Sequence, residues 1–222
     1  MYGNVSNKLN KMVDYLFSQY KDYPTHEVYL ELIAVFFGLW SVWCAKKDHI
    51  WVFPTGLIST SIYAYLLWQW SLLGDSMINV YYFIMSIYGW YHWTRKKGEV
   101  DEFPISVVTT KDKITGILIF VTTLVFVVFV YLYFNKFTTW YSYVDTLLTA
   151  LFFVGMWLMA KRKIENWIFW IVGDVISVPL YFAKGYTFTS FQYLIFTIIA
   201  VYGYLEWKKI FNSSQNLALR QL

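Results

Sequence analysis

Residues 165–183 read ENWIFWIVGDVISVPLYFA, an apolar run of membrane length that contains an amide and a carboxylate. A transmembrane helix needs about 20 mostly apolar residues, and this run meets that length. Asn166 and Asp174 are costly to place in hydrocarbon, and such groups face a ligand path or a partner when they lie at membrane depth. The run therefore predicts a transmembrane helix with a functional polar face.

The rest of the chain has the composition of an integral membrane protein. Of its 222 residues, 58% are hydrophobic, 23% are aromatic and only 14% are charged, whereas soluble domains carry about 25% charged residues. We expect an all-α polytopic membrane protein with seven transmembrane helices. The six further segments of membrane length are residues 28–45, 50–70, 76–94, 114–134, 141–160 and 186–207.

The regions before and after these segments are short. Residues 1–27 repeat apolar side chains at helical spacing between lysines, which favours a helix lying in the membrane interface, with a loosely ordered tail as the alternative. The chain does not open with a charged region, an apolar stretch and a cleavage site, so we expect no cleaved signal peptide. Residues 211–222 are expected to form a cytoplasmic tail.

The single cysteine and the net charge exclude several kinds of site. Cys44 alone allows neither an intrachain disulfide nor a thiolate metal cluster. The three histidines are not spaced with carboxylates as a ligand set, so we expect no metal, no cofactor and no catalytic residue. The net charge of +4 comes from basic residues scattered over loops and tails, which favours membrane lipids over nucleic acid as partners.

The basic residues also predict an orientation. Thirteen of the 18 lie on the side of the loop between the first two segments, and the other five lie on the opposite side. Because cytoplasmic loops carry the excess of lysine and arginine, we expect the N-terminus outside and the C-terminus in the cytoplasm.

The first three segments resemble the last three at a separation of 114 to 118 residues. Residues 28–97 and 140–210 would each form a three-helix repeat, and residues 98–139 would supply a loop and a linker helix that gives both repeats the same orientation. The expected architecture is three plus one plus three. The matched stretches are Ala45-Lys46-Lys47 with Ala160-Lys161-Arg162, Ile58-Ser59 and Tyr63 with Ile176-Ser177 and Tyr181, and Tyr88-Gly89 and Trp93 with Tyr202-Gly203 and Trp207.

A polar stripe runs along the sixth segment. Asn166, Trp170 and Asp174 are spaced i, i+4 and i+8, which keeps them on one helix face. A carboxylate one turn from an indole attracts an organic cation, and an amide pairs with a carboxamide or with hydroxyls. We expect a substrate site here, with a structural polar network as the alternative. Its further candidate residues are Trp167, Ser177, Gln192, Tyr193, Thr197 and Tyr202.

Three other polar residues are candidate gate groups. Glu31 and Asp145 each open the first helix of a repeat, where a carboxylate also gains from the helix dipole. That structural role is favoured over a gate. Asn79, with Tyr82 and Ser86 at i+3 and i+7, lies in the third segment, where such residues more often hold helices together than bind substrate.

The sixth segment resembles the PnuC family of bacterial vitamin transporters, which is best known for nicotinamide riboside. The residues that carry the resemblance are Glu165-Asn166-Trp167, Trp170, Asp174, Ile176-Ser177 and Tyr181. The resemblance implies a homotrimer with a fold related to the SWEET sugar transporters. It also implies facilitated diffusion that becomes one-way through phosphorylation by a cytoplasmic kinase, in support of NAD biosynthesis. The substrate ring would lie against Trp170 and Asn166.

Other functions stay open at this stage. Relatives in the same family are similar to transporters of thiamine or of riboflavin. A proton-coupled carrier would use Asp174, Glu31 or Asp145 as its proton group. A structural or sensory membrane protein would carry no flux. An enzyme is disfavoured, because no nucleophile with its base and no ligand set is present in the sequence.

Overall fold

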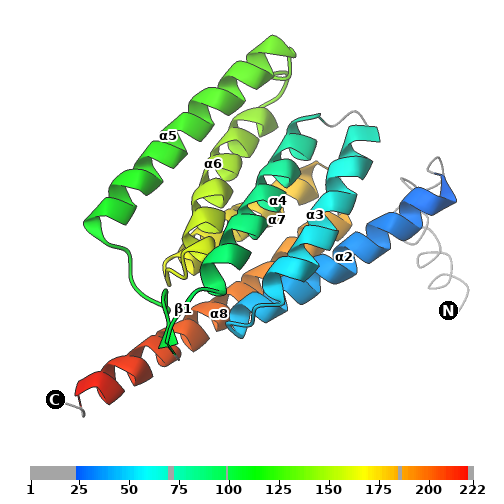
Figure 1. Ribbon diagram of the computed structural model, residues 1–222. Coiled ribbons are helices and arrows are strands. Elements are labelled where there is room, and N and C mark those ends of the chain that lie inside the picture. The colour runs from blue at the N-terminus through cyan, green and yellow to red at the C-terminus, as the bar shows by residue number, and fades with distance from the viewer. Residues whose placement is uncertain (1–23, 70–72, 99, 185–186, 220–222) are drawn as a thin grey trace, which may run out of the picture.

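The computed structural model describes residues 24–69, 73–98, 100–184 and 187–219, and helices make up most of this part of the chain (Figure 1). Each segment predicted to cross the membrane lies in a helix of its own. The predicted interfacial helix falls on residues 1–23, which lie outside the described residues. The helices are α2 (Thr25–Lys46), α3 (Val52–Gln69), α4 (Leu73–Trp93), α5 (Thr110–Tyr133), α6 (Tyr141–Ala160), α7 (Asn166–Ala183) and α8 (Thr187–Leu219).

Four helices of the described part are long and apolar enough to cross a membrane, namely α2, α5, α6 and α7. The helices α3 and α4 carry many hydroxyl and amide side chains. In α3 these hydroxyls are paired with helix carbonyls. Ser59 donates to the Ala34 carbonyl and Thr60 donates to the Gly56 carbonyl, both at 2.8 Å. Such pairing lets polar side chains hold helices together in a bilayer.

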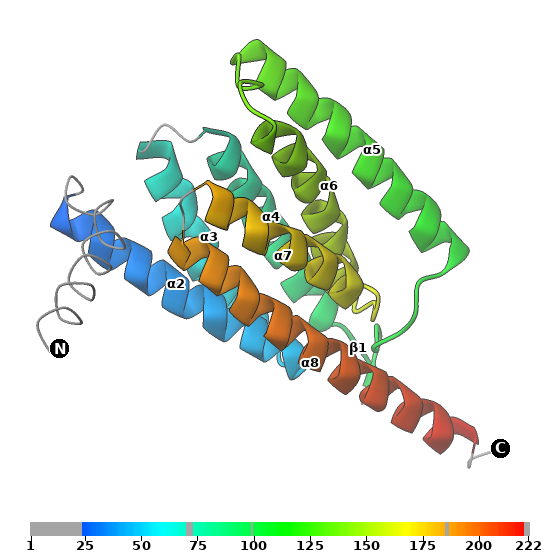
Figure 2. The same cartoon turned by 180° about the vertical axis from the view of Figure 1, so that it is seen from behind.

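Six of the helices pack side by side in a closed ring. Neighbours follow in the order α6, α4, α3, α2, α8, α7 and back to α6, while α5 packs along α6 at the edge of the bundle (Figure 1). Figure 2 shows α2 and α8 side by side on the other face. One half of the ring is therefore α2, α3 and α4, the other is α6, α7 and α8, and they meet along α2–α8 and α4–α6.

The turns that follow α2 and α6 have the same backbone hydrogen bonds. His49 N donates to the Cys44 carbonyl and Lys163 N donates to the Leu158 carbonyl, both at 2.9 Å. The second pair lies 114 residues after the first, since 163 corresponds to 49 and 158 to 44. The two halves thus share one local geometry at this end of the ring, which we call the basic end because Lys46, Lys47 and residues 161–163 lie there.

Gly89 and Gly203, which are 114 residues apart, each leave room for an aromatic ring. The two rings, Phe53 and Trp167, are also 114 residues apart. A Cβ atom added at Gly203 would lie 2.7 Å from the Trp167 ring, and one added at Gly89 would overlap the Phe53 ring. This register differs from the predicted match of Ser59 with Ser177, which needs a shift of 118. The first-half counterparts of the polar stripe are uncharged: Val52 for Asn166, Gly56 for Trp170 and Thr60 for Asp174.

Two features differ from the sequence expectations. A short ribbon of β1 (Lys96–Lys97) and β2 (Val100–Asp101) follows α4 where only a loop was expected, and Gly98, with φ of 71°, supplies the left-handed residue that its tight turn needs. Helix α8 also continues past the predicted end of its segment at residue 207 into the expected tail. No glycine or proline interrupts it there, and Ile210 and Phe211 still pack against the core.

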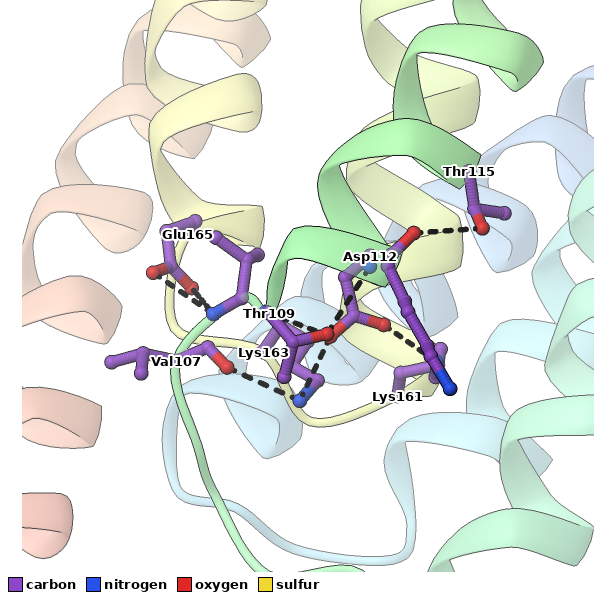
Figure 3. Close-up of polar contacts among 9 residues, drawn as sticks. Val107, Thr109, Asp112, Thr115, Lys161, Lys163 and Glu165 are labelled. Carbon is purple, nitrogen blue, oxygen red and sulfur yellow. Dashed lines mark hydrogen bonds and ion pairs between the residues drawn. The ribbon is translucent and has the colours of Figure 1, made fainter.

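The first turn of α5 is tied to the turn between α6 and α7 (Figure 3). Asp112 forms a capping box with Thr109, and its carboxylate lies 2.7 Å from Lys161 Nζ and 3.2 Å from Lys163 Nζ. Glu165 accepts from the Val108 backbone N–H at 3.0 Å. A carboxylate at a helix N-terminus is also favoured by the helix dipole, so these contacts fix α5 to the second half of the ring.

Arg162 joins the two halves at the basic end. Its Nε lies 3.1 Å from Asp48 Oδ1, its Nη1 lies 2.7 Å from Asp101 Oδ2, and its guanidinium lies 4.5 Å from the Trp93 ring centre. Asp48 and Arg162 occupy equivalent positions in the two turns, and both have left-handed backbones, with φ of 51° and 52°.

Two indoles cross between the halves at the same level. Trp93 Nε1 donates to the Ala160 carbonyl at 3.1 Å, and Trp207 Nε1 donates to the Ala45 carbonyl at 2.9 Å. Each indole therefore reaches the end of the first helix in the other half. We call Asp48, Trp93, Arg162 and Trp207 the latch.

Burial raises the pKa of Asp48 to about 6, and Arg162 opposes this rise. The Asp101 carboxylate adds to the rise and His49 acts against it. Because the pKa of Asp48 is higher in the folded chain than in the unfolded one, its contribution to stability is fully present below the usual aspartate pKa of about 3.9. That contribution is lost as the pH rises through about 6.

Replacing Asp48 with asparagine should therefore change how stability depends on pH. Asparagine tolerates the left-handed backbone, and Arg162 keeps its ion pair with Asp101. We expect Asp48→Asn to be more stable than the wild type by about 1 kcal/mol near pH 7.5 and to match it only near pH 4 and below. Thermal unfolding of the detergent-purified protein across this range measures the difference, with Glu102→Gln as the control, because Glu102 pairs with the exposed Arg95 instead. A variant less stable than the wild type at pH 7.5 would show that pairing with Arg162 outweighs burial.

Candidate functional site

Aromatic side chains from four helices of the ring gather beside the middle of α7. The Trp170 ring centre lies 5.4 Å from that of Phe152 in α6 and 6.2 Å from that of Tyr82 in α4. Tyr193 in α8 lies 6.3 Å from Phe152, with the two ring planes only 7° apart. We call Tyr82, Phe152, Trp170 and Tyr193 the aromatic cluster.

Asp174 lies next to this cluster, one turn after Trp170. Its side chain is buried, at 3% exposure, and it interacts electrostatically with Tyr82. Within the part of the chain that the structure describes, its carboxylate has no ion pair and no hydrogen bond. The neighbouring Ser177 hydroxyl donates instead to the Gly173 carbonyl at 2.8 Å. A buried carboxylate without a partner is costly, so the arrangement suits a cationic ligand.

Two glycines let the cluster pack this closely. A Cβ atom added at Gly173 would overlap the Phe152 ring, and one added at Gly155 would lie 3.4 Å from Trp170 Cε2. Because both positions are glycine, Phe152 of α6 packs against α7 and Trp170 of α7 packs against α6.

Asn166 and Trp167 lie at the start of α7, near the basic end. Asn166 is fully buried and its Nδ2 donates to the Lys163 carbonyl at 2.6 Å. Trp167 is 1% exposed and meets Trp207 edge to face at 5.6 Å. Asn166 Oδ1 and Trp167 Nε1 are buried polar atoms without a hydrogen bond among the described residues. An acceptor and a donor on adjacent residues are thus available to a polar ligand.

The candidate residues from α8 lie in different surroundings. Tyr193 belongs to the aromatic cluster, and Gln192 precedes it and is half-buried. Thr197 donates to the Tyr193 carbonyl at 2.8 Å. Tyr202 is 57% exposed, and Lys46 Nζ lies 5.2 Å from its ring centre, so Tyr202 lies apart from the cluster.

The three candidate gate residues lie in α6, α2 and α4. Asp145 in α6 pairs with Lys184 at the end of α7, at 2.6 Å. This contact lies within the second half of the ring, and Asp145 lies beyond the first turn of α6. Glu31 in α2 and Asn79 in α4 are half-buried.

Sequence reasoning missed two members of the aromatic cluster. Tyr82 was assigned to helix association, yet it lies beside Trp170. Phe152 is one of 19 phenylalanines, and nothing in its local sequence separates it from the others. The only signal is Gly173, whose missing side chain makes room for the ring, and that pairing becomes visible only when α6 and α7 are placed together.

Comparison with known proteins identifies a family. The family model described as nicotinamide mononucleotide transporter matches residues 28–209. The nicotinamide riboside transporter PnuC of Escherichia coli (strain K12) is 24% identical over 217 residues, which cover 87% of this chain and 90% of that protein. The riboflavin/roseoflavin transporter RibM of Streptomyces davaonensis is 25% identical over 203 residues, which cover 90% of this chain and 92% of that protein.

The fold has a counterpart among solved structures. A crystal structure of the vitamin B3 transporter PnuC matches with a TM-score of 0.62 and 23% identity, over 83% of each chain. This likeness agrees with the helical architecture described above. Because the family model spans most of the chain and several helices can cross a membrane, the chain belongs to the nicotinamide mononucleotide transporter family, also called the PnuC family, and is a multi-pass membrane transporter rather than an enzyme.

Proposed function

We propose that this protein takes up nicotinamide riboside by facilitated diffusion across a bacterial inner membrane. The observation that carries the proposal is Asp174, a buried carboxylate that lies beside Trp170 without a cationic partner among the described residues. Nicotinamide riboside is a pyridinium cation with a carboxamide and a ribose. Its charge would pair with Asp174 and its ring would stack on Trp170, which together supply Coulomb and cation–π attraction.

The polar ends of the substrate would meet the start of α7. Asn166 lies one helical turn from Trp170, a rise of about 6 Å along the axis, which a nicotinamide riboside molecule can span. The free Asn166 Oδ1 and Trp167 Nε1 would accept from and donate to the carboxamide or the ribose hydroxyls. Ser177, Gln192 and Tyr193 would line the other side of the path, while Tyr202 would contribute from outside the aromatic cluster.

Transport would proceed by rocking the two halves of the ring about this site. The 114-residue register supports two parallel three-helix repeats, with α5 as the linker that keeps them in the same orientation. We propose that all seven helices cross the membrane, with the N-terminus outside and the C-terminus in the cytoplasm. The latch would then close the cytoplasmic side, because it joins the halves at the basic end.

We also propose how the vitamin is kept in the cell and how copies of the chain assemble. A cytoplasmic kinase would phosphorylate the vitamin and so make net uptake one-way, which would feed NAD biosynthesis. Three copies of the chain would form a homotrimer in which each copy has its own path. Glu31, Asp145 and Asn79 remain candidate gate residues, and the pairing of Asp145 with Lys184 supports a structural role for that carboxylate.

Riboflavin is the second candidate substrate, because a relative of similar identity is a riboflavin/roseoflavin transporter. Thiamine is a third, since it is also an aromatic cation. Asp174 favours the two cations, because neutral riboflavin would leave the carboxylate without a partner. A proton-coupled carrier would use the same carboxylate for a proton, and uptake into liposomes that lack a kinase would then stop when an uncoupler is added.

Replacing single residues of the polar stripe with alanine should weaken the binding of nicotinamide riboside. We expect Trp170→Ala and Asn166→Ala each to lose about 1 to 3 kcal/mol, through lost stacking and an unpaired polar group. Calorimetry on the detergent-purified protein measures this loss. Trp68→Ala is the matched control, because Trp68 is 65% exposed. Unchanged affinity in both site variants would place the substrate elsewhere.

Removing the charge of Asp174 should weaken the binding of cationic vitamins more than the binding of a neutral one. Asp174→Asn keeps the shape of the side chain and removes its charge. We expect it to lower the affinity for nicotinamide riboside and thiamine at least tenfold, the effect of losing about 1.4 kcal/mol, and to leave riboflavin binding little changed. Titration of the three vitamins into both proteins tests this. Equal losses for all three vitamins would mean that Asp174 shapes the site without selecting charge.

The rate at which the single cysteine, Cys44, is modified reports whether the latch is closed. Cys44 is 6% exposed and lies in one buried cluster with Trp93 and Trp207. Arg162→Gln would remove the ion pairs of Arg162 with Asp48 and Asp101, so we expect a maleimide to modify Cys44 several times faster in this variant. Arg95→Gln is the control, because it breaks the more exposed pair with Glu102 near the same end. Equal modification rates in Arg162→Gln and the wild type would show that these ion pairs do not hold the cytoplasmic side closed.

A further inference from the structure

The Phe152 ring is close to parallel with two other rings of the aromatic cluster. Its ring plane is tilted by 25° from that of Trp170, at 5.4 Å, and by 7° from that of Tyr193, at 6.3 Å. The three residues come from α6, α7 and α8, and Phe152 is only 9% exposed. Aromatic rings attract one another in such offset-stacked arrangements, and a flat ligand ring can take the same position on Trp170.

Gly173 fixes where the Phe152 ring lies. The ring rests against the α7 backbone at this glycine, where any Cβ atom would overlap it. The next residue along the chain is Asp174, and Trp170 lies one turn before it. Phe152 therefore packs against the indole and against the helix backbone immediately before the buried carboxylate.

We propose that Phe152 determines which ring the transporter accepts. Its phenyl ring takes the stacking position on Trp170 in the protein without substrate, and it turns aside when a substrate ring enters. The room that this movement frees limits the size of the ring that can stack. A single pyridinium ring fits a space of about one phenyl ring, whereas the three fused rings of riboflavin need more. This inference rests on the proposed function, since it assumes that the substrate ring stacks on Trp170.

A purely structural role for Phe152 makes a different prediction. A buried phenylalanine that only packs α6 against α7 would, when truncated, lower the melting temperature through the cavity that it leaves. It would leave the preference between vitamins unchanged. The preference is therefore the informative readout, and the melting temperature serves as the check on folding.

The chain offers a matched control in the next residue. Phe153 is on the same helix, but its ring stacks on Tyr81 at 3.7 Å and 8°, and Tyr81 in turn donates to the Phe153 carbonyl at 3.0 Å. Truncating Phe153 removes the same number of atoms from the same helix without touching the stack of Phe152 on Trp170.

The test compares riboflavin and nicotinamide riboside binding to the full-length, detergent-purified protein by calorimetry and competition. In Phe152→Ala we expect the ratio of riboflavin affinity to nicotinamide riboside affinity to rise at least tenfold, the discrimination that small changes in pocket volume give. Phe152→Trp should lower this ratio, and Phe153→Ala should leave it within about twofold of the wild type. If Phe152→Ala does not fold, Phe152→Leu removes the flat ring, and we expect a smaller rise in the same direction.

The outcomes separate this inference from the proposed function. A folded Phe152 variant whose ratio stays within about twofold of the wild type, while the wild type binds nicotinamide riboside, would overturn the role of Phe152 alone. An equal rise in Phe153→Ala would also overturn it, because the effect would then be general loosening of α6. A wild type that binds neither vitamin would overturn the proposed function and this inference together.

Discussion

A carboxylate buried at membrane depth is the constraint on which this site depends. Asp174 is buried beside the aromatic cluster, and no cation of the described residues pairs with it. Keeping such a group charged requires a ligand that carries the opposite charge. The surrounding aromatic rings add attraction for a flat cation while excluding water. The chemistry of the site thus follows from one buried acidic residue and the aromatic cluster beside it.

The two halves of the ring share a backbone geometry but differ in the side chains that they carry. Their turns repeat the same hydrogen bonds 114 residues apart, and each contains one left-handed residue. At the basic end this symmetry brings Asp48 and Arg162, equivalent positions of opposite charge, into an ion pair across the halves. At the centre the symmetry is broken, because Gly56 and Thr60 stand where the second half has Trp170 and Asp174.

The helices could be predicted well from the sequence, because a bilayer requires long apolar runs and these are visible by composition alone. The stripe in α7 was also visible, since residues four apart share a helix face. The residues that pack against that stripe were not visible in the sequence. Phe152 and Tyr82 reach Trp170 from other helices, and only the packing of the ring brings them there. Arg162 was counted as a loop cation, yet it is buried between two carboxylates.

The most direct test of the central claim is an experimental structure of the protein with nicotinamide riboside bound. The account predicts the pyridinium ring stacked on Trp170, within about 6 Å of its ring centre, with Asp174 as the nearest charged group and Phe152 turned out of the stack. A structure with the vitamin bound elsewhere, and with Phe152 still lying on Trp170, would contradict it.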